Sequence, residues 1–380
     1  MTLLFISHEA SLTGAPKVLL HFMRWLKANR PDVNIIILLG RGGAVEDEFQ
    51  ELGTTYVWHE ARTTVDVITS RLLPFLKTKL SRRQRAIVSA IKAADIDLVY
   101  GNTVLAAPLM EALSLDVPSV LHVHELKYNV ERYGYSEALL RVLNQVDRVI
   151  AVSRLVYDYF HKQQQIEEIR LRLIHEFIEP IDAADLSKKV LTDLPEGAFV
   201  IGGCGTINWR KGTDLFVQVA HQVLSQFPDR PIYFVWLGGN LKHHNYYELQ
   251  HDVDKLGWTD HILFLGNHKN PQDFFARFDL FLMTSREDPF PLVCLENAQL
   301  GNPIICFEDA VGSQEFIDER TGGVVSYLDT KSMAEAVIDY YEYPKRKVAA
   351  GQKIQRAVAE YTVDEMAPKL WNVLEEVSRK

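Results

Sequence analysis

Asp288 and Glu296 lie eight positions apart in a segment, residues 284–307, whose pattern could bind a phosphorylated ligand. A strand is predicted to end before this pair, and a helix is predicted from about Pro291 to Leu300. Proline suits the first helical position because its missing N–H costs little there. An aspartate that caps a helix and a solvated helix glutamate would give the same pattern. Amides that open a helix bind phosphate, and the candidates here are those of Phe290, Leu292 and Val293.

Lys211 offers a positive charge that could bind an anionic ligand. It lies in a loop, residues 205–214, that follows a predicted strand and opens a helix. Its neighbour Arg210 faces either the same ligand or solvent. Taken alone, Lys211 is explained as a solvated loop lysine.

Gly14 belongs to a turn, residues 11–17, that follows the first predicted strand. A single glycine is neither the dinucleotide-binding fingerprint nor a Walker loop. The turn is therefore either a plain strand-to-helix connection or a loop that approaches a ligand. Asn102 follows another strand and is either a helix cap or a contact to a second substrate.

His122 and His124 end a predicted strand, where alternation places both side chains on one face. Two histidines could begin a metal site, but no third ligand stands nearby in the sequence, so we expect no metal. His124 is then either a buried structural histidine or a group of the active site.

Short apolar strands alternate with amphipathic helices along the whole chain, which predicts α/β domains with doubly wound parallel sheets. The strands are apolar on both faces, as strands covered by helices on both sides must be. The first set is predicted at 3–7, 34–39, 54–58, 97–101, 118–124, 148–153 and 170–174. The second set is predicted at 199–205, 232–238, 262–266, 279–285, 303–307 and 323–327.

Two tandem Rossmann-like domains follow from this pattern. We expect residues 1–180 to form the first, 181–198 a polar linker, and 199–362 the second. The last helix, 363–380, is expected to pack across the domain junction. Ligands of such sheets bind at the carboxyl ends of the strands, so the predicted site lies in a cleft between the domains.

The composition limits the function. The chain has 380 residues, of which 47% are hydrophobic, and a net charge of −9, which argues against a nucleic-acid partner. No apolar run is long enough to span a membrane. Three cysteines form neither a disulfide framework nor a metal spacing, so a reducing, cytoplasmic location is expected.

A basic segment departs from this acidic balance. Residues 72–93 have leucines and isoleucines at near-helical spacing, with basic residues between them and no acidic residue. This pattern predicts either a solvated surface helix or an amphipathic helix on an anionic membrane at the inner face of the cell.

Residues 284–307 resemble the acidic-x7-acidic signature of the retaining glycosyltransferases of family 4, which have the GT-B fold. The family pattern is Ser-x-x-Glu-Gly-Phe-Gly-Leu-Val-x-Leu-Glu-Ala, followed by Gly-x-Pro-Val. Residues 288–296 overlay it without gaps, and Gly301 and Pro303 complete it. Asp288 replaces the usual glutamate, and Pro289 and Pro291 replace two glycines.

The resemblance implies a role for each of these positions. In the family the first carboxylate holds hydroxyls of the donor sugar, here Asp288 with Glu287 as a substitute, and the second, Glu296, holds the ribose. The amides between them receive the diphosphate, and Lys211 before Gly212 grips it. His124 matches a histidine near the reacting sugar. Thr206 departs from the family, which often has an arginine there.

The sequence therefore predicts a glycosyltransferase that moves a sugar from a nucleotide-diphosphate sugar to a hydroxyl of a glycan or lipid-linked acceptor. The family implies retention of the anomeric configuration and no metal. His124, Asp288 and Lys211 are the expected catalytic residues, Gly14 and Arg210 are on the donor side, and Asn102 and His124 are on the acceptor side. A non-catalytic nucleotide-sugar-binding protein and a nucleotide-sugar 2-epimerase are the alternatives.

Overall fold

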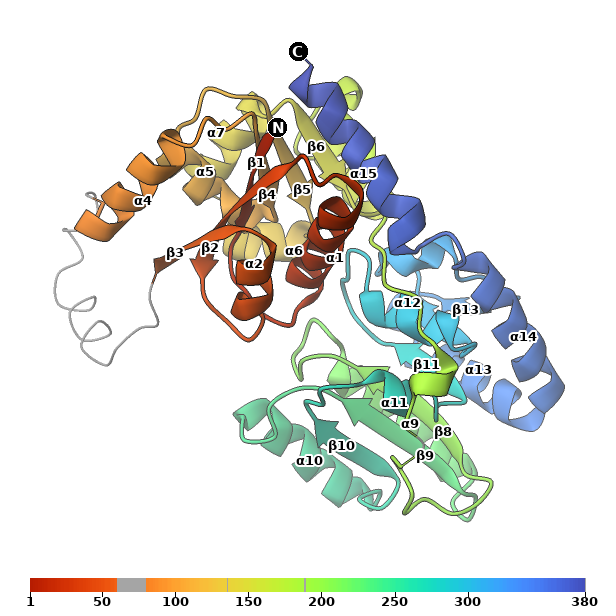
Figure 1. Cartoon of the computed structure of the whole chain (residues 1–380). Helices are drawn as coiled ribbons and strands as arrows, with labels where there is room; N and C mark the ends of the chain where they lie inside the picture. The colour runs from red at the N-terminus through yellow and green to blue at the C-terminus, as the bar shows by residue number, and fades with distance from the viewer. Residues whose placement is uncertain (60–79, 135, 188, 380) are drawn as a thin grey trace. The chain divides into compact units, whose positions relative to one another are not determined.

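The computed structural model describes residues 1–59, 80–134, 136–187 and 189–379. The chain forms two compact units, drawn in Figure 1. Unit 1 comprises Met1–Glu176 and Val363–Lys380, and unit 2 comprises Phe177–Thr362. Among the described residues, no helix is both long enough and apolar enough to cross a membrane.

Unit 1 contains a seven-stranded sheet in the order β3-β2-β1-β4-β5-β6-β7, in which all pairs are parallel. Its strands are β1 Thr2–Ser7, β2 Asn34–Arg41, β3 Thr54–His59, β4 Leu98–Asn102, β5 Ser119–Val123, β6 Arg148–Ala151 and β7 Leu171–Leu173. Its main helices are α1 Gly14–Asn29, α2 Glu46–Leu52, α4 Arg82–Lys92, α5 Ala107–Leu113, α6 Lys127–Asn129, α7 Glu137–Gln145 and α8 Arg154–Lys162. Short single-turn segments are η2 Val104–Ala106, η3 Val130–Gly134 and η4 Glu168–Arg170.

Alternate residues of the central strand β1 face opposite layers of helices. The Phe5 ring lies 6.2 Å from that of Phe22 on α1 and 5.3 Å from that of Tyr100 on β4. Leu4 and Ile6 instead join a buried cluster with residues of α4 and α5. Both faces of the sheet are therefore covered, which explains why the strands are apolar on both sides.

The C-terminal helix α15, Val363–Ser378, packs against α1 in unit 1. Its Glu376 carboxylate pairs with Arg148 and lies 2.8 Å from the Arg172 guanidinium. The chain thus returns from unit 2 to complete unit 1.

Unit 2 contains a six-stranded parallel sheet in the order β10-β9-β8-β11-β12-β13. Its strands are β8 Phe199–Cys204, β9 Ile232–Leu237, β10 Ile262–Gly266, β11 Leu280–Met283, β12 Ile304–Phe307 and β13 Gly322–Val325. Its helices are η5 Ala183–Asp185, α9 Thr213–Gln226, α10 His244–Leu256, α11 Gln272–Phe275, α12 Leu292–Gln299, η6 Gly312–Glu315, α13 Thr330–Glu342 and α14 Pro344–Ala357.

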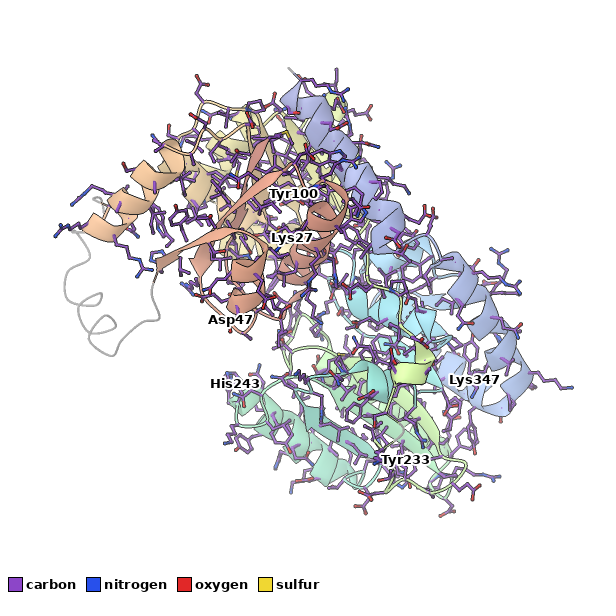
Figure 2. All side chains as sticks on the ribbon, viewed as in Figure 1. Lys27, Asp47, Tyr100, Tyr233, His243 and Lys347 are labelled. Carbon is purple, nitrogen blue, oxygen red and sulfur yellow. The ribbon has the colours of Figure 1, made fainter. Side chains whose placement is uncertain are left out.

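Aromatic side chains fill the core of unit 2. The Phe216 ring on α9 lies 5.2 Å from Trp236 and 5.5 Å from Phe234 on β9. Lys347 of α14, labelled in Figure 2, pairs with Asp279, the residue that immediately precedes β11. The predicted class, two parallel-sheet α/β domains, is confirmed.

Candidate active site

The candidate residues gather where the strand order of each sheet reverses. These switch points lie between β1 and β4 in unit 1 and between β8 and β11 in unit 2. Ligands of doubly wound sheets bind outside the carboxyl ends of the strands at such points.

The loop after β8 owes its path to Gly212. This residue has φ +66°, and a Cβ there would lie 1.9 Å from the carbonyl oxygen of Thr284. Only glycine allows this approach. The loop is also closed on itself, because the Lys211 amide donates to Asn208 Oδ1 over 2.9 Å. The backbone of Lys211 is thereby fixed beside the end of β11.

Lys211 and Arg210 both direct their side chains to Asp288. The Lys211 ammonium lies 2.5 Å and the Arg210 guanidinium 3.5 Å from Asp288 Oδ2. Arg210 also donates to the carbonyl oxygen of Glu287 over 2.7 Å. The sequence left open whether Arg210 faces a ligand or solvent, and the structure turns it toward the carboxylate.

The Asp288 carboxylate is buried and ionised. Its backbone is held on both sides, since its amide donates to Ala310 and its carbonyl accepts from Gly312. Burial alone would raise the pKa of Asp288, but the Lys211 and Arg210 cations outweigh burial and hold that pKa below its usual range. The side chain is therefore an acceptor over the working range of pH, as recognition of hydroxyl groups requires.

Arg286, in the loop after β11, binds both the loop after β8 and the first turn of α9. Its guanidinium makes two hydrogen bonds to Asp214, of 2.7 and 2.8 Å, and one of 2.6 Å to the Trp209 carbonyl. It also lies 5.0 Å from the centre of the Trp209 ring. The sequence did not reveal this bracket, because its partners are more than 70 residues apart.

Helix α12 begins one residue later than predicted. Pro291 is the N-cap, with an extended ψ of 118°, and Leu292 is the first helical residue. The Pro291 side chain makes no hydrogen bond to the helix, so it does not cap the first backbone amides of α12. The Phe290 ring packs against Phe316 and Tyr361. Phe290 and Pro291 therefore contribute their backbone, and not their side chains, to the start of α12. Leu292 and Val293 supply the first helical amides.

Glu296 on α12 is buried and accepts a 2.8 Å hydrogen bond from Gln272 on α11. Gln272 was missed from the sequence, although its place after the β10 loop puts it at the same edge of the sheet. The segment from Gly312 to Glu315 forms a single turn after the bridge between Asp288 and Val311.

In unit 1, Gly14 is the first residue of α1, after β1. The N-cap Thr13 makes no side-chain bond to the helix and instead lies 2.8 Å from Ser11 Oγ. The start of α1 is thus a second helix N-terminus at the carboxyl edge of a sheet.

His124, Asn102 and Glu176 meet in the interior of unit 1. His124 Nε2 lies 2.9 Å from Asn102 Oδ1, and Nδ1 lies 2.8 Å from Glu176 Oε1. The sequence identified the first two residues but missed Glu176, which follows β7 and lies 52 positions from His124. Its place after a strand was the available signal.

His122 and His124 share one face, as predicted, with ring centres 4.2 Å apart. His122 Nδ1 bonds the hydroxyl of Tyr100, which lies within unit 1 in Figure 2. No group of three or more His, Cys, Asp or Glu residues suited to a metal occurs in the described part of the chain.

Comparisons with known proteins agree with these features. A model of group 1 glycosyl transferases matches residues 198–342, and a glycosyltransferase family 4 model matches residues 12–180. The lipopolysaccharide core biosynthesis mannosyltransferase LpsB of Rhizobium meliloti is 28% identical over 65% of this chain and 69% of its own length. The corresponding mannosyltransferase LpcC of Rhizobium leguminosarum is 28% identical over 59% of this chain and 62% of its own length.

Solved structures share the fold over nearly the whole chain. Anabaena HepE, solved with UDP and glucose, has a TM-score of 0.79 at 19% identity, over 98% of this chain and 99% of HepE. WaaG, a glycosyltransferase involved in lipopolysaccharide biosynthesis, has a TM-score of 0.74 at 12% identity, over 98% of this chain and 99% of WaaG. The GT-B fold expected from the sequence is confirmed.

Proposed function

Because this chain belongs to glycosyltransferase family 4, we propose that unit 2 binds a nucleotide-diphosphate sugar and that unit 1 binds the hydroxyl acceptor. The chain is a glycosyltransferase, and the proposal concerns which of its groups hold each substrate. The observation that carries it is the meeting of Lys211, Arg210 and Asp288 at the β8–β11 switch point, one turn before the uncapped start of α12.

The two cations and the helix N-terminus suit a diphosphate. A cation and helix amides favour the negative charge that grows on the diphosphate as the bond to the sugar breaks. Asp288, ionised and acceptor-only, is suited to hydroxyls of the donor sugar, and Glu296 to the ribose. Glu287 remains the substitute for Asp288, and Gly14 at the start of α1 is the proposed donor contact of unit 1.

Retention of configuration sets the geometry of the step. The bond between the anomeric carbon and the diphosphate breaks, and its electron pair leaves with the diphosphate. The acceptor oxygen bonds the anomeric carbon on the same face and passes its proton to the diphosphate. We propose that no metal ion is required to offset the negative charge of the departing diphosphate, because Lys211 and Arg210 supply positive charge.

The relatives suggest the kind of acceptor. LpsB and LpcC are named for lipopolysaccharide core biosynthesis, and another relative, WclY of Escherichia coli, for O-antigen biosynthesis. We therefore place the enzyme in the assembly of a cell-surface glycan or glycolipid, on the cytoplasmic side, with a glycan or lipid-linked acceptor.

We propose that the basic segment contacts an anionic membrane through its positive charges and not through apolar side chains. Residues 72–79 lie outside the described residues. In α4, the capping box of Ser81 and Gln84 starts the helix, and Ile87 and Ile91 are buried in the core of unit 1. The predicted apolar membrane face is wrong for this part of the segment, because the core already covers it. Three arginines stay exposed there, Arg82, Arg83 and Arg85.

A donor screen tests the proposal. Purified protein is incubated with UDP-, GDP- and ADP-sugars, and release of free sugar is measured with and without acceptor glycans. Slow release from one donor supports the transferase. Conversion to an epimer would instead indicate an epimerase, and binding without turnover a non-catalytic protein.

A further inference from the structure

We infer that Glu176 is a positioning residue that holds His124 as a doubly protonated imidazolium, so that His124 acts as a fixed cation and hydrogen-bond donor rather than as a base. The protonation state stands on the geometry of unit 1 alone. Only its effect on turnover rests on the proposed function.

Both ring nitrogens of His124 face acceptors. Glu176 Oε1 lies 2.8 Å from Nδ1, and Asn102 Oδ1 lies 2.9 Å from Nε2. Asn102 is fixed in this orientation because its Nδ2 donates to the Ala15 carbonyl over 3.1 Å. A neutral imidazole carries a proton on only one ring nitrogen. The other nitrogen would then face an oxygen with no proton between the two acceptors, whereas the imidazolium donates a hydrogen bond to both oxygens.

Because His124 and Glu176 are both buried, the charge of His124 depends on the Glu176 carboxylate. The His124 and Glu176 side chains are 4% and 5% exposed. An uncompensated charge is costly at such a site, whereas a hydrogen-bonded pair of opposite charges is tolerated. Removing the carboxylate therefore removes the main reason for His124 to stay charged.

The other ionisable neighbours are consistent with one cation at His124. His122, whose ring centre lies 4.2 Å from that of His124, is hydrogen-bonded through Nδ1 to Tyr100, and its pKa is held well below its usual range by burial and next by the His124 charge. Glu125 accepts from the amides of Val104 and His124, not from the ring, and burial raises its pKa. His8 lies beside Glu9 and bonds Thr103.

A cation with both N–H groups engaged cannot take a proton from the acceptor. This agrees with a step in which the diphosphate takes that proton. It also gives Glu176 a measurable role, because loss of the carboxylate should make the charge of His124 depend on pH.

Nitrogen NMR of the full-length protein labelled at histidine tests the inference without any assay. At pH 8 we expect the wild-type His124 to show two protonated ring nitrogens, assigned by their loss in His124→Gln. A single protonated nitrogen in the wild type would overturn the inference, whatever the enzyme turns over.

Three variants separate charge from shape. In Glu176→Gln, which keeps the volume and one acceptor, His124 should be neutral at pH 8. In the control Glu125→Gln, which alters a nearby carboxylate that bonds only amides, His124 should stay doubly protonated. In the double variant Asn102→Asp/Glu176→Gln, a carboxylate on the other nitrogen should restore the charge. An unchanged His124 in Glu176→Gln, or no restoration in the double variant, contradicts the inference.

Turnover gives an independent readout. Glu176→Gln should lower kcat by roughly 100-fold at pH 8, comparable to misplacing a group by about 1 Å, with little change in the KM of the donor. Its kcat should rise as the pH falls and the imidazolium returns, while the wild type shows no such rise. A merely structural role would give the same profile in both proteins. If no donor is turned over, the proposed function fails while the NMR result stands.

Discussion

Lys211 Nζ lies 2.5 Å from Asp288 Oδ2, and this ion pair joins the loop after β8 to the loop after β11. The two residues are 77 positions apart and meet because β8 and β11 are neighbours in the sheet. The pair places a cation for a diphosphate against an anion for a sugar hydroxyl. The two halves of a sugar diphosphate thus have adjacent recognition groups within unit 2.

Lys211→Ala should lower kcat by about 10²–10³-fold, the usual effect of removing one group that stabilises developing negative charge. Turnover of the best donor is measured, and circular dichroism checks the fold. The exposed pair of Lys331 and Glu335 supplies the control, since Lys331→Ala should leave turnover unchanged. Equal turnover of Lys211→Ala and wild type would remove Lys211 from the mechanism.

Gly212→Ala should abolish transfer, because the new Cβ would meet the Thr284 carbonyl. Gly257 is a matched control: it also has a positive φ, of +78°, but nothing lies within 4 Å of a Cβ placed there. Both variants bear a left-handed backbone cost of about 1–2 kcal/mol, seen in thermal unfolding. Only Gly212→Ala should lose activity, and similar activities of the two would show that the close approach is unimportant.

Asp288→Asn should lower the free energy of unfolding by about 1–3 kcal/mol near neutral pH, because it leaves the partly buried Lys211 and Arg210 cations without their counter-ion. The Asp288 pKa is lowered in the folded state, so its stabilisation is complete above the unfolded value of 3.8 and disappears as the pH falls through the lower folded value. Denaturant unfolding of both proteins should therefore differ at pH 7, begin to approach each other near pH 3.8 and converge only once the pH is below the lowered folded pKa of Asp288. The exposed Asp252→Asn should match the wild type throughout. A difference that grows on acidification would contradict the assignment.

Replacing Arg82, Arg83 and Arg85 by alanine should weaken binding to anionic vesicles, since each basic residue near such a surface contributes about 1 kcal/mol. Sedimentation of the protein with vesicles measures this. Wild-type binding should also vanish at about 1 M salt, where charges are screened within about 3 Å. The control replaces three exposed basic residues of α14, namely Lys345, Lys353 and Arg356. If the two triple variants bind alike, the α4 arginines do not contact the membrane.

Local patterns were enough to predict the sheets. The predicted strands occur in both units because runs such as residues 34–39 are apolar on both faces, and the helix over Val363–Ser378 follows from its apolar spacing. The start of α12 was misplaced by one residue, because the sequence does not set the ψ of Pro291.

Contacts between distant residues were not predictable. Nothing local indicates that Glu176 meets His124, that Arg286 binds Asp214, or that Arg210 turns toward Asp288. Each depends on which strands become neighbours. The residues themselves were visible because they follow strands, but their pairing required the fold.

Calorimetric titration of wild type and Lys211→Ala with UDP-, GDP- and ADP-sugars shows whether unit 2 binds a nucleotide-diphosphate sugar through Lys211. We expect one nucleotide-diphosphate sugar to bind the wild type with a stoichiometry near one, and Lys211→Ala to bind it at least about tenfold more weakly, a loss of about 1.4 kcal/mol. Binding of none of these donors, or equal affinity of the two proteins, would contradict it.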